Sequence, residues 1–343
     1  MRRIDLPHLT PGMVIGRSLY NSLGQTLLKA GTILSANYIR RLELLGIPCV
    51  YIHEPHLKLP DIRDVISDET RVTAMVRVRD ILLDTNTATI ALRADGALRC
   101  VQDIVQELLR NSHAVVNLTD IRLDDDYLFA HSVNVCVLAL LTGIALGYPK
   151  PKLQELGLGA LFHDVGKVMV PKPILNKPGH LSPEEYAIVK RHADHGFAIL
   201  KDMPAIKDIA YQHHERVDGT GYPLSLKGGS IFETSQIVAM ADVFDALTAH
   251  RQYRTGFPAH EAYEYLSASG NKAFDMKLLQ VFLKNIAAYP SGVMVELNDG
   301  AKAIVLDTPP GAPQQPRVRL LDSRSELMLR DSDLFIVRVV PNG

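Results

Sequence analysis

The sequence has few cysteines and no long hydrophobic segment, and both absences restrict where the protein can act. Its three cysteines, Cys49, Cys100 and Cys136, lie far apart and form no Cys-X-X-Cys pair, so we expect reduced thiols that pack in the interior. The N-terminus has no apolar segment of the kind found in export signals. The longest apolar run, residues 135–146, is interrupted by a threonine and a glycine and is too short to cross a bilayer. These absences predict a globular cytoplasmic protein with no membrane span.

An excess of charge of one sign is also absent. The chain has 37 Lys and Arg against 38 Asp and Glu, so its formal net charge is −1. No overall field attracts a nucleic acid polymer or an anionic membrane, and a polyanionic ligand has to be held by a local site. The length of 343 residues, with 47% hydrophobic and 22% charged residues, is typical of a folded protein of about two domains with a small appendage.

Hydrophobic periodicity divides the chain into four segments and predicts a mainly α fold. Residues 1–57 are expected to form a small α+β unit, residues 58–111 a helical linker, residues 112–290 an all-helical domain and residues 291–343 a β appendage. The linker has apolar residues at helical spacing. Its helices are expected to pack either within the same chain or against a second copy in a homodimer.

Local signals mark the start of two helices and two strand regions. Ser35 can cap a helix in the first unit, and residues 49–52 are expected to form a strand after it. In the helical segment, Ser182 and Glu185 are spaced as a capping box. Near the C-terminus, the Asn-Asp-Gly turn at residues 298–300 separates two alternating segments and predicts a hairpin.

Side chains that bind metals recur in short clusters along the helical segment. Imidazole and carboxylate together suit first-row transition metals, and the absence of cysteine from the set argues against a structural zinc site. Seven ligands exceed what one tetrahedral ion needs but suit two ions that share a carboxylate. The candidates are His131, His163 and Asp242 for one ion, His192, His213 and His214 for the other, and Asp164 as the bridge.

Cationic side chains near these clusters suit a phosphate ester as substrate. Lys167 follows His163 by one helical turn. Arg251 and Arg254 are spaced to share one face of a helix, and their guanidinium groups can form bidentate hydrogen bonds with a phosphate. A pair of metal ions can activate a water molecule and stabilise both the attacking and the leaving oxygens of a phosphate ester.

Every one of these residues also has an ordinary structural interpretation. A single histidine is more often a core or surface residue than a ligand, and His180 and His195 are assigned no role. Asp164 alone could simply pair with Lys167, the two arginines could lie on a solvated face, and residues 218–223 could be only a tight turn. The joint occurrence of the clusters in one helical segment is what favours a site.

The order of these motifs resembles the HD-GYP phosphodiesterases, a subfamily of the HD-domain metallohydrolases. The resemblance is carried by HDVGK at residues 163–167, His192 with Gly196, HHE at 213–215, DGTGYP at 218–223 and ADVFDALT at 241–248 followed by RQYR at 251–254. It extends over residues 126–288, about half of the chain, and the ordered series is far more specific than the His-Asp pair alone.

The resemblance implies a fold, a reaction and roles for individual residues. It implies an all-helical HD-type domain that hydrolyses cyclic di-GMP to pGpG and in some members further to GMP, with the seven residues above as metal ligands and Asp164 and Lys167 as catalytic residues. Lys167, Arg251, Arg254, Asp245 and Tyr222 are then expected to contact the substrate. The GYP loop with Tyr222 and Pro223 would shape the rim of the site or bind partner proteins such as GGDEF-type cyclases.

Two positions depart from the family pattern. Some members have a glutamate that binds a third metal where this chain has Tyr127, so we expect a site with two ions, iron or manganese rather than zinc. Gln252 stands where proline is common. Two alternatives stay open: a cyclic dinucleotide sensor that signals through partner contacts, and an HD phosphohydrolase that acts on another cyclic dinucleotide or nucleotide.

Overall fold

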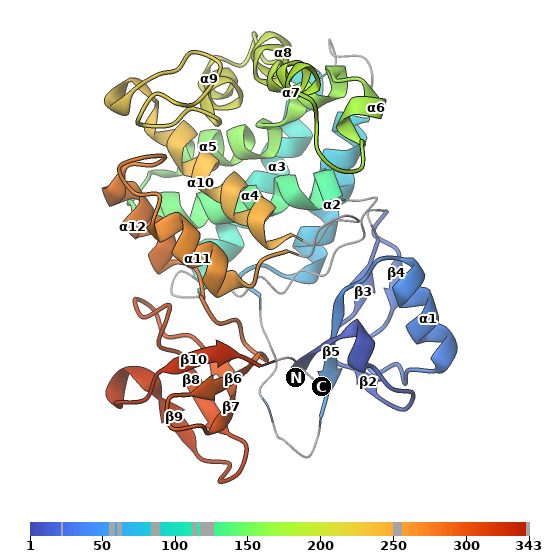
Figure 1. The fold of residues 1–343 in the computed structure, drawn as a ribbon. Helices are drawn as coiled ribbons and strands as arrows, with labels where there is room; N and C mark the ends of the chain where they lie inside the picture. Colours follow the sequence, from blue (N-terminus) through green and yellow to red (C-terminus); the bar gives the residue numbers. More distant parts are fainter. Residues whose placement is uncertain are drawn as a thin grey trace.

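A computed structural model describes residues 1–21, 23–54, 59, 64–83, 90–111, 115–116, 127–249 and 256–340, with only the backbone for residues 90–94 and 127. A helical domain occupies one end of the molecule, and two small units with strands lie at the other (Figure 1). Each of the three parts has its own hydrophobic core. The two small units contact each other where the amide of Arg3 donates to the carbonyl of Gly292 (3.1 Å).

The N-terminal unit is built around an antiparallel sheet with the strand order β1-β5-β2. Its elements are β1 (Arg2–Asp5), the 3-10 helix η1 (Leu6–His8), β2 (Val14–Ile15), β3 (Leu19–Tyr20), β4 (Thr26–Leu28), α1 (Ala36–Leu44) and β5 (Cys49–His53). The predicted cap is confirmed, since the side chain of Ser35 accepts from the amide of Tyr38. The predicted strand is β5, which lies in the centre of the sheet.

The helical domain begins before the expected boundary at residue 112. α2 (Asp68–Leu82) and α3 (Ile90–Arg110) pack against each other and against α4 (Tyr127–Ala145) and α5 (Lys150–Phe162). Most of their described apolar side chains are buried in the same core as those of α4, while Leu109 is exposed. The two helices are therefore part of the domain and not a separate linker, because the stripe that a second copy could have covered is covered by the same chain.

The remaining elements of the domain surround α4 and α5 (Figure 1). They are η5 (Val165–Met169), α6 (Lys172–Leu175), α7 (Pro183–Lys190), α8 (His192–Ile199), α9 (Pro204–Gln212), η6 (Gly228–Ser230), α10 (Glu233–Thr248), α11 (Ala259–Ser267) and α12 (Met276–Lys284). The capping box at the start of α7 is confirmed, with both of its hydrogen bonds between Ser182 and Glu185.

The core helix α4 is more apolar than its sequence run indicated. Among the described residues, Leu128–Ala145 is the one segment whose length and composition would allow it to cross a membrane. The prediction from residues 135–146 considered only part of this helix. However, 83% of this segment is buried inside the protein. The helix is apolar on all sides because other helices cover it on all sides.

The C-terminal unit is a five-stranded antiparallel sheet with the order β10-β6-β7-β8-β9. Its elements are β6 (Met294–Leu297), β7 (Lys302–Asp307), β8 (Arg317–Leu320), β9 (Glu326–Met328), η7 (Leu329–Asp331) and β10 (Ile336–Val339). The predicted hairpin is confirmed: residues 298–300 join β6 to β7, and Gly300 has a φ of +86°, which favours glycine.

Candidate metal centre

Five helices bring the seven predicted ligands to one region of the interior. They are His131 on α4, His163 and Asp164 at the end of α5, His192 at the start of α8, His213 and His214 directly after α9, and Asp242 on α10. Three sets of these residues have ligand atoms within 4.8 Å of one another: Asp164 with His192, His213 and His214; Asp164 with His131 and His163; and Asp242 with His163 and His213.

Asp164 lies between two groups of imidazoles. Its Oδ2 is 3.3 Å from Nε2 of His163 and 3.7 Å from Nε2 of His131. Its Oδ1 is 3.4 Å from Nε2 of His192 and 3.7 Å from Nε2 of His213. The two oxygens of one carboxylate therefore face different groups, as in a carboxylate that bridges two ions.

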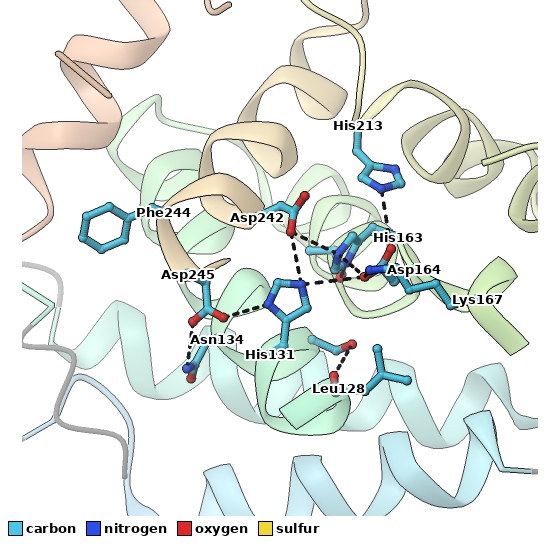
Figure 2. Close-up of polar contacts among 12 residues, drawn as sticks. Leu128, His131, Asn134, His163, Asp164, Lys167, His213, Asp242, Phe244 and Asp245 are labelled. Atoms are coloured by element: carbon cyan, nitrogen blue, oxygen red, sulfur yellow. Dashed lines mark hydrogen bonds and ion pairs between the residues drawn. The ribbon is translucent and has the colours of Figure 1, made fainter. Parts of the chain in front are cut away.

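Asp242 lies on the opposite side of the imidazoles from Lys167 in the close-up view (Figure 2). Its Oδ1 is 3.1 Å from Nε2 of His131 and 3.9 Å from Nε2 of His163, and its Oδ2 is 4.0 Å from Nδ1 of His214. This carboxylate completes the group around His131 and also reaches His214.

Three of the histidines are oriented by the backbone of the preceding turn. Each donates its Nδ1–H to the carbonyl three residues earlier, at 2.7 Å for His163, 2.7 Å for His192 and 2.9 Å for His213. Because a carbonyl only accepts hydrogen bonds, Nδ1 carries the proton and the lone pair of Nε2 points into the centre. Such outer hydrogen bonds are usual for metal-binding histidines.

Two buried atoms at the middle of the cluster have no hydrogen-bond partner. They are Nε2 of His163 and Oδ1 of Asp164. Leaving a buried polar atom without a partner costs about 1–3 kcal/mol, and a cation between imidazole and carboxylate would remove this cost. The orphaned atoms and the imidazole–carboxylate donor set together fit divalent transition metal ions.

The protonation states of the cluster also suit metal binding. Burial lowers the pKa of His192 to about 4 and holds that of His214 well below its ordinary value, so both rings are neutral at pH 7. Burial by itself would raise the pKa of Asp164, but the charge of Lys167 and the imidazole of His163 hold it well below its ordinary value. His192, His214 and Asp164 are thus deprotonated, as metal binding requires.

His131 differs from the other ligands, because a side chain orients it. Its Nδ1 lies 2.7 Å from Oδ2 of Asp245, and Oδ1 of the same carboxylate accepts from Nδ2 of Asn134 at 3.1 Å (Figure 2). Asp245 is fully buried. The expected substrate contact of Asp245 is therefore not supported, because both of its oxygens face protein groups and none of its surface is accessible.

Lys167 lies beside the carboxylate of Asp164. Its Nζ donates to Oδ2 of Asp164, while 23% of its side chain is exposed. The structural interpretation of this pair, an ion pair between Lys167 and Asp164, is therefore confirmed.

The loop with the Gly-Tyr-Pro sequence covers His214. The ring of Tyr222 stacks on the ring of His214, with centroids 4.7 Å apart and planes at 27°. Glu215 holds this loop in place, since its carboxylate accepts from the amides of Leu224 (2.6 Å) and Leu226 (2.9 Å). Residues 218–223 are therefore a turn that is fixed against the cluster.

Gly166 allows the close approach of two ligand-bearing segments. A Cβ at this position would lie 1.9 Å from the carbonyl oxygen of His192 and 2.5 Å from the amide of Gly196. Because η5 packs directly on the backbone of α8, Asp164 reaches His192. This explains the glycine in the HDVGK segment physically.

Some predicted residues cannot be placed. Arg251 and Arg254 lie outside the described residues, as does the side chain of Tyr127. Two buried residues were missed by the sequence reasoning: Asn134, which hydrogen-bonds Asp245, and Glu215, which holds the loop. The signal for Asn134 was its position one turn after His131 on an apolar helix.

Comparison with known proteins gives one family and several relatives. Residues 109–278 match the family model described as HD domain. A cyclic di-GMP phosphodiesterase of Pseudomonas aeruginosa is 37% identical over 227 residues, which cover 65% of this chain and 55% of that protein. A cyclic di-GMP phosphodiesterase of Thermotoga maritima is 39% identical over 144 residues, 40% of this chain and 39% of that protein.

A third relative is named for a different cyclic dinucleotide. A 3'3'-cGAMP-specific phosphodiesterase of Vibrio cholerae is 42% identical over 128 residues, which cover 36% of this chain and 24% of that protein. The chain thus spans about half or less of the length of these three curated relatives.

Proposed function

The chain belongs, through residues 109–278, to the HD domain family, and we propose that it is a metal-dependent phosphodiesterase that hydrolyses cyclic di-GMP to pGpG. The observation that carries this proposal is the position of Asp164, whose two oxygens face two groups of imidazoles. The names of the relatives in Pseudomonas aeruginosa and Thermotoga maritima support the proposal that cyclic di-GMP is the substrate. We also propose that the protein acts in the cytoplasm.

Two divalent transition metal ions are the proposed cofactors, and iron or manganese suits a donor set without thiolate. When bound, such a pair activates water and stabilises the charge on the phosphate that is attacked. One ion would be held by His131, His163 and Asp242, the other by His192, His213 and His214, and Asp164 would be shared.

The protein's own side chains have separate tasks around the ions. Lys167 supplies a positive charge beside Asp164, where charge develops on a phosphate in the transition state. Tyr222 presents an aromatic ring above His214, where it can shape the rim of the site. We assign phosphate contacts to Arg251 and Arg254 from the sequence alone. The loop at residues 218–223 is our proposed docking site for GGDEF-type cyclases.

The decisive experiment compares Asp164→Ala with the wild type. The manganese-loaded proteins are incubated with cyclic di-GMP, and pGpG and GMP are separated by chromatography. We expect the variant to lose more than about a hundredfold of the activity, because loss of even an outer hydrogen-bond partner of a metal ligand costs about 10–100-fold. Full activity and full metal content in this variant would show that the assignment is wrong.

A matched control tests whether the loss is specific to the cluster. His180→Ala removes an exposed histidine that lies outside the three ligand sets, and we expect unchanged activity. Because Tyr127 replaces the glutamate of some family members, we also propose that pGpG is the end product and that little GMP forms.

A second candidate substrate is 3'3'-cGAMP, which the 42% identical relative in Vibrio cholerae favours. Turnover of both cyclic dinucleotides is measured side by side with the same metal-loaded protein. If 3'3'-cGAMP is hydrolysed faster than cyclic di-GMP, it becomes the proposed substrate in place of cyclic di-GMP. Tight binding of either compound without any product would instead support a sensor.

A further inference from the structure

A continuous path of buried polar side chains connects the metal centre to a helix outside the HD domain segment. Arg71 on α2 donates from Nη1 to Oδ1 of Asn134, and Asn134 donates from Nδ2 to Oδ1 of Asp245. Asp245 in turn holds Nδ1 of His131. Arg71, Asn134 and Asp245 are 7%, 4% and 0% exposed, so water does not replace these contacts readily.

The direction of each hydrogen bond in this path is determined by its neighbour. A guanidinium group only donates, so the carbonyl of the Asn134 amide must face Arg71 and its NH2 must face Asp245. The NH2 occupies one oxygen of Asp245 and leaves the other for His131. Through Asn134, Arg71 thereby determines how the carboxylate of Asp245 is presented to His131.

The path continues from Arg71 to the N-terminal unit. Nη2 of Arg71 lies 2.7 Å from Oδ2 of Asp64, whose side chain is 4% exposed. Nη2 of Arg17, between β2 and β3, lies 3.6 Å from the same oxygen and also pairs with Asp68 at the start of α2. One buried carboxylate is thus shared by an arginine of the N-terminal unit and an arginine of the helical domain.

We propose that Arg71 is a positioning residue for the metal centre, and that Asp64 and Arg17 couple the metal affinity of the helical domain to the N-terminal unit. Residues 17, 64 and 71 all precede the segment 109–278 that matches the HD domain. The N-terminal unit then serves as a regulatory input, because a partner that displaces Arg17 removes one of the two charges around Asp64. The inference rests on the proposed metal centre but not on the choice of nucleotide.

The test measures Mn²⁺ affinity of the full-length apoprotein by isothermal titration calorimetry at constant pH. For Arg71→Met we expect about tenfold weaker binding, the lower end of the roughly 10–100-fold cost of losing an outer partner of a metal ligand, because Arg71 acts on that partner, Asp245, only through Asn134. Arg71→Lys should recover part of the affinity, since lysine can keep one of the two contacts but lacks the fork. Arg17→Met, which reaches Arg71 only through Asp64, should weaken binding by less than about tenfold.

A control separates positioning from simple loss of packing. Glu107 on α3 accepts hydrogen bonds from Ser67 and Thr70 and so anchors the same helix α2 without belonging to the path. Glu107→Gln should lower the melting temperature and leave the Mn²⁺ affinity unchanged. If Glu107→Gln loses as much Mn²⁺ affinity as Arg71→Met for a similar fall in melting temperature, the positioning role is overturned.

A spectroscopic readout tests the path without metal or substrate. In ¹⁵N-histidine-labelled apoprotein, His131 should give the Nδ1–H tautomer signal, and Arg71→Lys and Arg17→Met should show a growing share of the Nε2–H form. These two milder variants carry the test if Arg71→Met does not fold. Wild-type signals and wild-type affinity in both would overturn the proposal.

The outcomes also separate this inference from the proposed function. Wild-type protein that binds no Mn²⁺ overturns both. Wild-type protein that binds Mn²⁺ but leaves cyclic di-GMP intact, with affinity reduced in the Arg71 variants, contradicts only the substrate and supports the coupling.

Discussion

The histidines of the metal centre are oriented in two different ways, and His163 beside His131 is held by the backbone as His192 and His213 are. On the side of His192 and His213, each ring is held by a backbone carbonyl three residues earlier in its own segment. On the side of His131, the ring is held by Asp245 from α10, which in turn depends on Asn134 and on Arg71 of α2. The first arrangement is local and needs only the backbone to fold correctly. The second depends on side chains from three helices, and it is the side that a distant change can reach.

Gly166→Ala is expected to have the largest effect on stability and metal binding. It would displace the backbone that carries and orients His192. The added Cβ would lie 1.9 Å from the carbonyl oxygen of His192, and backbone cannot move aside as a flexible side chain can. We expect a loss of about 3 kcal/mol or more in the free energy of unfolding, measured by urea denaturation, together with weaker metal binding.

The control for this substitution is Gly229→Ala. A Cβ at Gly229 meets no atom within 4 Å, and the residue does not have a positive φ. Its stability should stay close to that of the wild type. Equal stability of both variants would mean that η5 and α8 are not as closely packed as described.

Asp245→Asn is expected to have an intermediate effect on metal affinity, because it changes only the orientation of His131. The new amide has one oxygen and one NH2, so it cannot accept from both Asn134 and His131 as the carboxylate does. We predict about 10–100-fold weaker metal binding, observed by calorimetry on the apoprotein. An affinity equal to that of the wild type would show that the two sides do not differ in the way we describe.

Tyr222→Ala is expected to have the smallest effect, since its ring lies against the rings of His214 and His192 and supplies none of the predicted ligand atoms. Removing the stacked ring should cost about 0.5–1.5 kcal/mol, seen as a raised KM for the cyclic dinucleotide with metal content unchanged. Tyr222→Phe keeps the ring and serves as the control. A loss of metal from the alanine variant alone would make the ring part of the metal centre instead of its rim.

The same contrast between local and distant contacts explains what was predictable. The caps at Ser35 and Ser182 and the turn at residues 298–300 were predicted correctly, because each depends on residues a few positions apart. The convergence of the seven candidate ligands followed from the order of their motifs and is consistent with the three ligand sets.

The errors all concern contacts between residues far apart in the chain. Asp245 was expected at the substrate from the family resemblance, yet its carboxylate is fully buried behind His131. For α2 and α3 the sequence left open whether they pack within the chain or against a second copy, because an amphipathic stripe does not say which surface covers it. The role of Arg71 had no local signal, since its partner Asn134 is 63 positions away.

The sequence alone determined the kind of chemistry and most local structure: which side chains can bind metals, where helices begin, and where chains turn. These properties depend on the chemical nature of a residue and on its immediate neighbours. Only the tertiary structure decided which carboxylate lies between the imidazoles, which one supports a ring from behind, and how an arginine outside the HD domain segment reaches the centre. Those assignments depend on how buried helices pack, and a buried charge is tolerated only where the fold supplies its partner.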